Sequence, residues 1–162
     1  MAAVTAVSNF VKGGQPFVTG DCAGDVVVND YYIDLTAAQL VTGNMFDLGV
    51  LPAGHVISDA ILISDDIDTN GSPAVTLDVG ILSGTPGDAT SDRTMDDVIF
   101  AASTVGQSGT AARASAKAAF IIQPVGYHRS IGLKVKLQPA TAAAGRVRLR
   151  AFMHPAAFPQ QF

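Results

Sequence analysis

The chain has 162 residues, of which 48% are hydrophobic and only 15% are charged, and its formal net charge is −4. Its length is typical of one domain with a substantial core, and no apolar run approaches the ~18 residues that a membrane-spanning helix needs. The lone Cys22 excludes an internal disulfide or a cysteine-based metal site. Soluble domains are usually about one-quarter charged, so we expect either a large core or a surface covered by other protein.

Acidic and basic residues are separated along the chain. All fourteen acids are aspartates between Asp21 and Asp97, whereas eight of the ten basic residues follow Asp97. The formal charge is 2 − 14 = −12 for residues 1–97 and 8 − 0 = +8 for residues 98–162. The acidic part of such a chain can pair with its basic part, either within one fold or between two copies. The lack of glutamate, a good helix former, favours strands and turns.

In chain order, residues 1–24 predict an extended N-terminal arm, because they are rich in glycine and poor in apolar residues. The start of the sequence lacks the basic region and apolar core of a signal peptide, so we expect a product made in the cytoplasm and not exported. Strand patterns cover residues 25–35, 44–50, 55–64, 74–82, 120–123, 130–137 and 146–153, with an ambiguous alanine-rich stretch at 111–119. Residues 36–43 predict a helical turn, and residues 94–104 predict a short helix.

Two of these strands are the most regular. Residues 55–64 are apolar on both faces, which predicts a central strand buried on both sides. Residues 74–82 alternate, and the Asn70-Gly71 turn before them favours an antiparallel neighbour of the first strand. About eight strands at this spacing predict an all-β, jelly-roll-like β-sandwich over residues 25–154, with at most one short helix. We expect residues 155–162 to form a C-terminal tail.

The loop after residue 64 contains a partial calcium motif. Asp66, Asp68 and Asn70 match the opening of an EF-hand loop, whose alternate oxygens surround the ion. The twelfth position, which should hold a bidentate glutamate, is Leu77. A polar loop without a metal is therefore the favoured interpretation, with a weak calcium site as the alternative.

No catalytic pattern occurs in the sequence. His55, His128 and His154 share no metal-ligand spacing, and neither a nucleophile elbow nor a phosphate-binding glycine motif is present. We therefore expect no enzymatic activity, catalytic residue, cofactor or small-molecule substrate.

Basic residues alternate with apolar ones in two late strands. Arg146, Arg148 and Arg150 fall on one face of the last strand, and Lys134 and Lys136 do so in the preceding one. If these strands pair as a hairpin, five cations share a face and need a negative partner. Nucleic acid is disfavoured by the net negative charge and by the lack of aromatic residues between the cations. We predict that these five residues form an interface with an acidic protein surface, although a solvated face is the simpler alternative.

The stretch DLGVLPAGHVISDAILISDDIDTNGSPAVTLDVG (residues 47–80) resembles a pattern in structural proteins of tailed bacteriophages. The resemblance continues through AASTVGQSG (residues 101–109) and the final GRVRL hairpin, and it covers about residues 44–152. It implies a virion protein, with a jelly-roll-type capsid decoration or cement protein as the favoured kind. Such a protein would bind between major capsid protein subunits on the outer surface of the capsid. A homo-oligomer, either a dimer or a trimer, is expected, with no nucleic acid or membrane as partner.

Two other functions fit the same fold. A head-fibre, tail or baseplate component is the alternative within the virion. A carbohydrate-binding sandwich is the alternative outside it, disfavoured by the absence of tryptophan and the presence of only three tyrosines.

Overall fold

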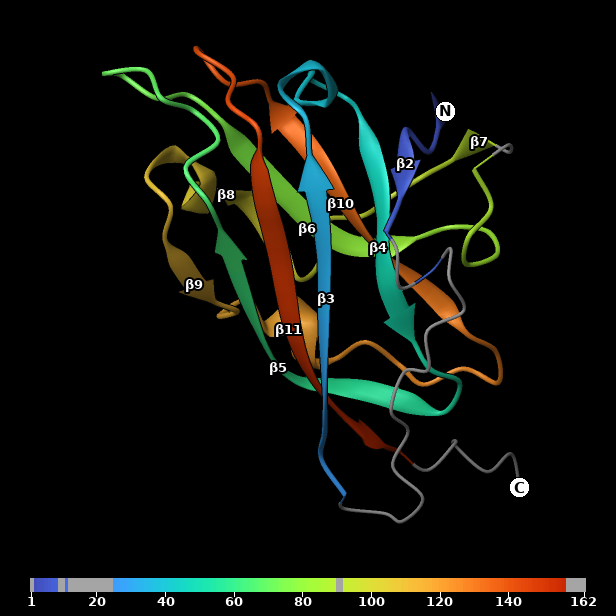
Figure 1. The fold of residues 1–162 in the computed structure, drawn as a ribbon. Helices are drawn as coiled ribbons and strands as arrows, with labels where there is room; N and C mark the ends of the chain where they lie inside the picture. Colours follow the sequence, from blue (N-terminus) through green and yellow to red (C-terminus); the bar gives the residue numbers. More distant parts are fainter. Residues whose placement is uncertain (1, 9–10, 12–24, 90–91, 157–162) are drawn as a thin grey trace, which may run out of the picture.

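The computed structural model describes residues 2–8, 11, 25–89 and 92–156, which form a sandwich of two β-sheets (Figure 1). One sheet has the strand order β2-β4-β10-β6-β8, the other has the order β3-β11-β5-β9, and β1 pairs with β7 in a small separate ribbon. The strands of the sandwich are β2 (Ala6–Val7), β3 (Val27–Leu35), β4 (Met45–Leu51), β5 (His55–Ser64), β6 (Thr76–Leu82), β8 (Phe100–Ser103), β9 (Ala111–Arg113), β10 (Arg129–Leu137) and β11 (Gly145–Pro155).

The topology is that of a jelly roll. Along the chain from β3 to β6, each strand lies in the sheet opposite the one before it, and β9, β10 and β11 alternate in the same way. Two Greek keys folded on each other produce this pattern. The predicted all-β, jelly-roll-like sandwich is confirmed. The described residues contain no long helix, and none of their helices could cross a membrane.

Short elements complete the fold. Helical turns occur at η1 (Ala37–Gln39) and η2 (Val105–Gln107), and α2 (Lys117–Phe120) is one turn of α-helix. The remaining short strands are β1 (Ala2–Ala3) and β7 (Asp92–Arg93).

The core lies between the two sheets and is built from alternate residues of each strand. Leu77 and Val79 of β6 belong to this core from one sheet and Val147 and Leu149 of β11 from the other, and all four are fully buried. Tyr31 spans the two layers, because its hydroxyl donates a 2.7 Å hydrogen bond to the main-chain oxygen of Val50 on β4. Burial of apolar side chains on this scale is the main stabilising contribution to a sandwich.

The five-stranded sheet also has a covered outer face. Every residue of β4 is buried, because the N-terminal segment and the β6–β8 connection both lie over its outer side. Val4 and Val7 pack there with Met45 and Leu82 in a second, smaller apolar cluster. β2 adds to the sheet by parallel pairing with β4. Residues 9–10 and 12–24 of the proposed arm, and residues 157–162 of the proposed tail, lie outside the described residues.

Several predictions about individual strands are wrong. β5 and β6 are not neighbours but lie in opposite sheets, because the 65–75 loop crosses the sandwich instead of closing a hairpin. β5 is buried on one face only, since Ile61 and Ile63 are half-exposed on the other. The predicted hairpin of β10 and β11 is also absent, as these strands too belong to different sheets.

Two segments adopt a different structure from the one predicted. Residues 94–104 do not form a helix. Asp96 instead accepts a 2.7 Å hydrogen bond from the main chain of Ile81, and the buried Phe100 begins β8. Residues 120–123 are not a strand, because α2 extends to Phe120 and a turn follows it. Tertiary contacts override local propensity at both places.

Candidate interaction surface

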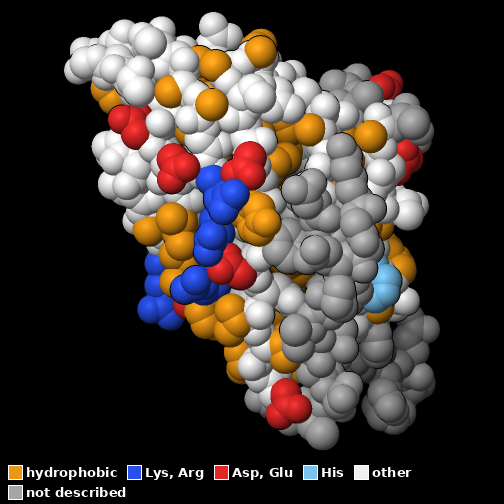
Figure 2. Space-filling model, in the orientation of Figure 1, with side chains coloured by type: hydrophobic (Ala, Val, Ile, Leu, Met, Phe, Trp, Pro, Cys, Tyr) orange, Lys and Arg blue, Asp and Glu red, His pale blue; other side chains and the backbone are white. Residues whose placement is uncertain are grey.

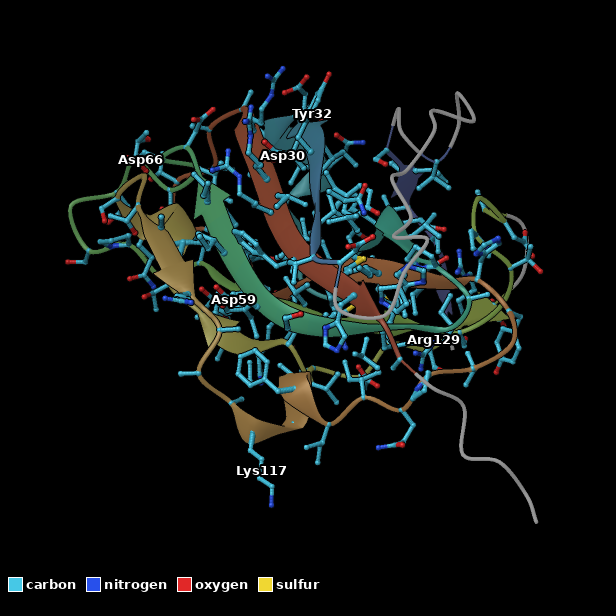
Figure 3. The ribbon with its side chains drawn as sticks, turned by 90° about the horizontal axis from the view of Figure 1, so that it is seen from below. Asp30, Tyr32, Asp59, Asp66, Lys117 and Arg129 are labelled. Carbon is cyan, nitrogen blue, oxygen red and sulfur yellow. The ribbon has the colours of Figure 1, made fainter. Side chains whose placement is uncertain are left out.

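The β3-β11-β5-β9 sheet presents one of its faces outward (Figure 2). Basic side chains run along its middle, with acidic and hydrophobic side chains beside them. We call this surface the exposed sheet face. Its half-buried or exposed side chains, of which Figure 3 labels Asp30, Tyr32 and Asp59, are Val28, Asp30, Tyr32, Asp34, Val56, Ser58, Asp59, Ile61, Ile63, Ala111, Arg113, Arg146, Arg148, Arg150, Phe152 and His154.

Arg146 at one end of the face is fully paired. It lies directly opposite Asp34 of β3, and its Nε and Nη2 atoms donate to the two carboxylate oxygens over 2.7 and 2.9 Å. Its guanidinium also lies over the ring of Tyr32, 4.3 Å from the centroid. The hydrogen bond from Arg146 lowers the pKa of Asp34, and the same bond raises the pKa of Arg146. A two-point carboxylate pair combined with stacking on an aromatic ring holds this arginine in one orientation.

Arg148 and Arg150 have only one acid between them. Both donate to Oδ2 of Asp30, over 3.1 and 3.2 Å. The other carboxylate oxygen of Asp30, Oδ1, is buried and accepts no hydrogen bond within the described part of the chain. The acids that meet the arginine row therefore come from the same sandwich, on the adjacent strand β3.

Arg113 and Asp59 form another pair near the edge of the face. The guanidinium contacts both carboxylate oxygens, with distances of 2.9 and 2.7 Å. The hydrogen bond to Asp59 raises the pKa of Arg113. Because the arginine is 74% exposed, solvent screens the pair and it adds little to stability.

Lys134 and Lys136 do not join the arginines. They lie on β10, in the centre of the other sheet, so the five cations do not share one face. Nζ of Lys136 lies 3.6 Å from Asp78 on the neighbouring strand β6. The alternation correctly placed each set on one face of its own strand, but alternation does not specify which strands are neighbours.

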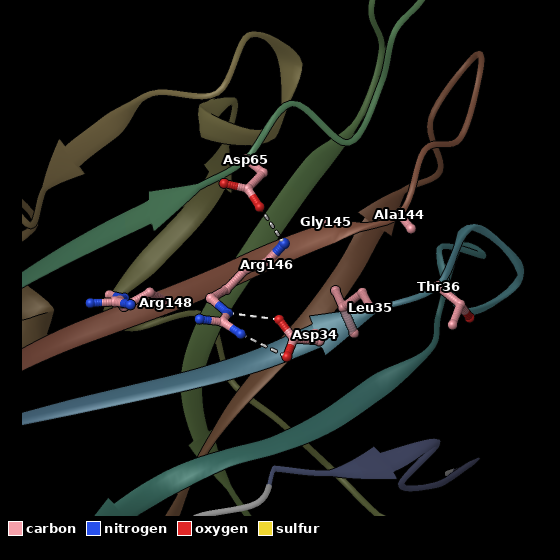
Figure 4. A pocket seen from close by; sticks show the side chains of 8 residues that line it. All are labelled: Asp34, Leu35, Thr36, Asp65, Ala144, Gly145, Arg146 and Arg148. Carbon is pink, nitrogen blue, oxygen red and sulfur yellow. Dashed lines mark hydrogen bonds and ion pairs between the residues drawn. The ribbon is translucent and has the colours of Figure 1, made fainter.

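A surface depression lies at the loop end of the arginine row (Figure 4). Its lining residues are Asp34, Leu35, Thr36, Asp65, Ala144, Gly145, Arg146 and Arg148. The side chain of Asp65 accepts a 2.8 Å hydrogen bond from the main chain of Arg146, whose guanidinium is directed to Asp34. The polar groups here mostly form hydrogen bonds with one another, which argues against a preformed ligand-binding site.

The proposed calcium motif serves a structural purpose. Asp68 is buried, and its carboxylate accepts backbone N–H bonds of 2.7–3.1 Å from Ala74, Val75, Ala140 and Thr141. Burial raises the pKa of Asp68, but these four bonds lower it by more, so the pKa lies below its ordinary value. The carboxylate joins the β5–β6 loop to the β10–β11 loop.

The other two residues of the motif also bond nearby groups. Oδ1 of Asp66 accepts from the main chain of Asp68, and the side chain of Asn70 bonds Ser72 and Thr141. No cluster of three or more histidine, cysteine or acidic residues suited to a metal occurs in the described ranges.

The three histidines are in separate places. His55 bonds the main-chain oxygen of Ala53, and His128 accepts from the main-chain nitrogen of the same residue. His154 lies on the exposed sheet face, with Nδ1 2.6 Å from Oγ of Ser58. A serine–histidine pair resembles part of a hydrolase site, but within the described residues no carboxylate bonds the imidazole of His154 to orient it.

Sequence reasoning did not identify Asp30, Tyr32 and Asp34 as partners of the arginine row. A signal was present, because these residues alternate along residues 25–35 and must share one face of a strand. What was missing was the knowledge that β3 lies beside β11.

The chain matches no protein-family model and no curated protein sequence. It is similar to a solved chain described as "Capsid of Ralstonia phage GP4", with 44% identity, a TM-score of 0.88, and coverage of 93% of this chain and 97% of that one. It is also similar to a chain of the "Cyanophage Pam1 capsid asymmetric unit", with 26% identity, a TM-score of 0.67, and coverage of 88% and 96%. Both similarities extend over nearly the whole sandwich.

Proposed function

The chain belongs to a family of bacteriophage capsid proteins, and we propose that it is a decoration or cement protein of the phage head. In this role it binds between major capsid protein subunits on the outer surface of the capsid and stabilises the head. It acts without catalysis or cofactor, and it is made in the host cytoplasm before assembly. The observation that carries the proposal is similarity to a capsid chain over 93% of the sequence.

The physical character of the molecule supports a role in an assembly. With a charged fraction of 15% and a hydrophobic fraction of 48%, its composition resembles that of subunits with extensive protein contacts. Large apolar residues remain exposed at several places, with Ile121 at 55% and Tyr127 at 66%. Contact with other subunits would cover such groups, which cost free energy when they face water.

The exposed sheet face is the proposed contact surface for other protein. It combines arginine, tyrosine, phenylalanine and isoleucine side chains on a rigid sheet, and the first three of these residue types are enriched in interfaces. The lysines of the predicted interface, Lys134 and Lys136, are assigned no part in this surface because they lie on the opposite sheet. We also propose that the protein is a homo-oligomer.

Heads with and without the protein provide the test. Capsids assembled without this chain should release their genome at a lower temperature, and adding the purified chain back should restore the wild-type temperature. Added protein should bind in a saturable, fixed ratio to the major capsid protein. Equal thermal stability of the two kinds of head, together with no binding on add-back, would reject the cement role. Binding to tails instead would favour the head-fibre, tail or baseplate alternative.

A further inference from the structure

The arginines of the exposed sheet face are not equally neutralised. Arg146 and Arg113 each make a two-point pair with an acid of their own. Arg148 and Arg150 share one oxygen of Asp30, over longer distances of 3.1 and 3.2 Å. The charge of this trio is +2 − 1 = +1. Within the described residues, no further acid forms an ion pair with either arginine.

The surplus charge lies among apolar side chains. In the sheet register, Arg148 is opposite Ile63 of β5 and Arg150 is opposite Ile61. Phe152 follows on the same face of β11, and all of these side chains are half-buried. A partly desolvated guanidinium beside aliphatic and aromatic groups has the composition of an interface centre and differs from an ordinary solvated surface. A matching partner needs a carboxylate flanked by apolar side chains.

The same chain presents such a group at the start of β3. Asp25 is exposed and takes part in no ion pair with another described residue. Next to it, Val26 and Val28 are 56% and 46% exposed, although valine is among the residue types most often buried. Val28 lies on the exposed sheet face, two residues before Asp30. The chain therefore carries an acid with apolar neighbours just before β3 and a surplus cation with apolar neighbours on the exposed sheet face.

We propose that the exposed sheet face is a self-association surface. On it, Arg148 and Arg150 of one copy receive the carboxylate of Asp25 from a second copy, while the valines beside that acid pack on Ile61, Ile63 and Phe152. Each copy carries both halves of the contact, so the contact is self-complementary in charge and hydrophobicity. The proposal deepens the proposed function, since it specifies how the cement protein forms its oligomer.

The long strands of the face have room for a small contact. Three strands of nine to eleven residues at ~3.3 Å per residue give a length of ~30 Å, and a spacing of ~4.8 Å gives them a width of ~14 Å. Their flat area is roughly 420 Å², and β9 adds little because it has only three residues. A standard interface buries about 800 Å² per partner, so face-to-face packing of these strands would form a contact at the small end of the size range.

Neutral substitutions at matched positions give the first test. Self-association of the purified full chain is measured by sedimentation equilibrium for wild type, Arg148→Gln and Arg113→Gln. Both substitutions remove one arginine from the same sheet face, but Arg113 belongs to a completed pair. We expect Arg148→Gln to weaken self-association at least ~10-fold, and Arg113→Gln to leave it unchanged. Equal effects of the two substitutions would overturn the proposal.

Charge reversal identifies the acid. Asp25→Arg and Arg148→Asp should each produce monomers at concentrations where the wild type is oligomeric, because like charges then meet across the contact. The double variant restores opposite charges, so it should recover self-association. Circular dichroism and the melting temperature verify that each variant is folded. A folded double variant that stays monomeric would reject the pairing of Asp25 with Arg148.

Binding to heads separates this proposal from the cement role. A monomeric Arg148→Asp variant that still binds heads weakly would support both, because loss of the oligomer reduces avidity. If the wild type is monomeric at ~100 μM and Arg148→Asp abolishes head binding, the face contacts the capsid protein and self-association is rejected. If neither the wild type nor any variant binds heads, the cement role is rejected. The self-association surface is still supported in that case, provided that the variants change self-association as predicted.

Discussion

Arg93 and Asp47 form an ion pair from which solvent is excluded. Nη1 of Arg93 lies 2.8 Å from Oδ2 of Asp47, and the two side chains are 1% and 0% exposed. The same guanidinium donates to Oγ of Ser130 and to the main-chain oxygens of Asp88 and Ser83. Because Asp47 is on β4 and Ser130 is on β10, the arginine ties the β6–β8 connection to the outer side of the five-stranded sheet.

Removing one partner of this pair should strongly destabilise the fold. We expect Arg93→Met to lower the free energy of unfolding by about 3–5 kcal/mol, because Asp47 then stays buried without a countercharge. Urea denaturation of the purified chain measures the change. Arg113→Met, which breaks an exposed pair, is the control and should cost less than ~1 kcal/mol. Similar losses in the two variants would mean that water reaches the buried pair.

Asp68 should make stability depend on pH. The pKa of its carboxyl is lowered in the folded chain and is about 3.9 in an unfolded one. Its contribution is therefore fully present above about pH 4 and is lost as the pH falls from there towards the folded pKa. Asp68→Asn should lower the free energy of unfolding by about 2–4 kcal/mol at pH 7, because the four backbone donors then lose a charged acceptor.

The difference between wild type and Asp68→Asn, followed by thermal unfolding from pH 7 to pH 3, should shrink below about pH 4. A difference that stays constant over this range would show that the ionised carboxylate is not what binds the two loops.

Ala102 occupies a backbone conformation that suits glycine. Its φ is +50°, and its main-chain nitrogen donates a 2.7 Å hydrogen bond to Asp78. Ala102→Gly should raise the free energy of unfolding by about 0.5–1 kcal/mol, because the left-handed region costs alanine about 1–2 kcal/mol. Its neighbour Ala101, whose φ is not positive, is the control, and Ala101→Gly should lower the stability of the fold. Thermal melts of both variants provide the comparison, and a lower melting temperature for Ala102→Gly would contradict the argument.

Ile61 and Leu62 are adjacent on β5 but face opposite sides of the sheet. Leu62 is fully buried in the core, whereas Ile61 is half-exposed beside Arg113 and Arg150. We expect Leu62→Ala to lower the free energy of unfolding by about 2–5 kcal/mol and Ile61→Ala to lower it by less than ~1.5 kcal/mol. The sequence-based expectation that residues 55–64 form a strand buried on both sides is therefore wrong. Chemical denaturation of the two alanine variants distinguishes these positions, and equal losses would restore the doubly buried interpretation.

The elements that were predictable are those with a strong local pattern. The β-branched and aromatic run at 25–35 became β3, and the apolar run at 55–64 became β5 with the same bounds. Strand pairing was not predictable, because alternation specifies which face a residue is on but not which strand lies beside it. For this reason the hairpin of β5 with β6 was wrong, and the acids opposite the arginine row were missed. The helix predicted over residues 94–104 was wrong for another reason, since Asp96 accepts a hydrogen bond from the neighbouring strand β6 instead of lying in the first turn of a helix.

The position of the chain in the virion tests the central claim most directly. A cryo-electron microscopy map of the intact particle, compared with one of particles lacking this protein, shows which density belongs to it. The account predicts that the difference density is a jelly-roll sandwich on the outer surface of the head, seated where major capsid protein subunits meet. Difference density confined to the tail or baseplate, or inside the shell, would contradict it.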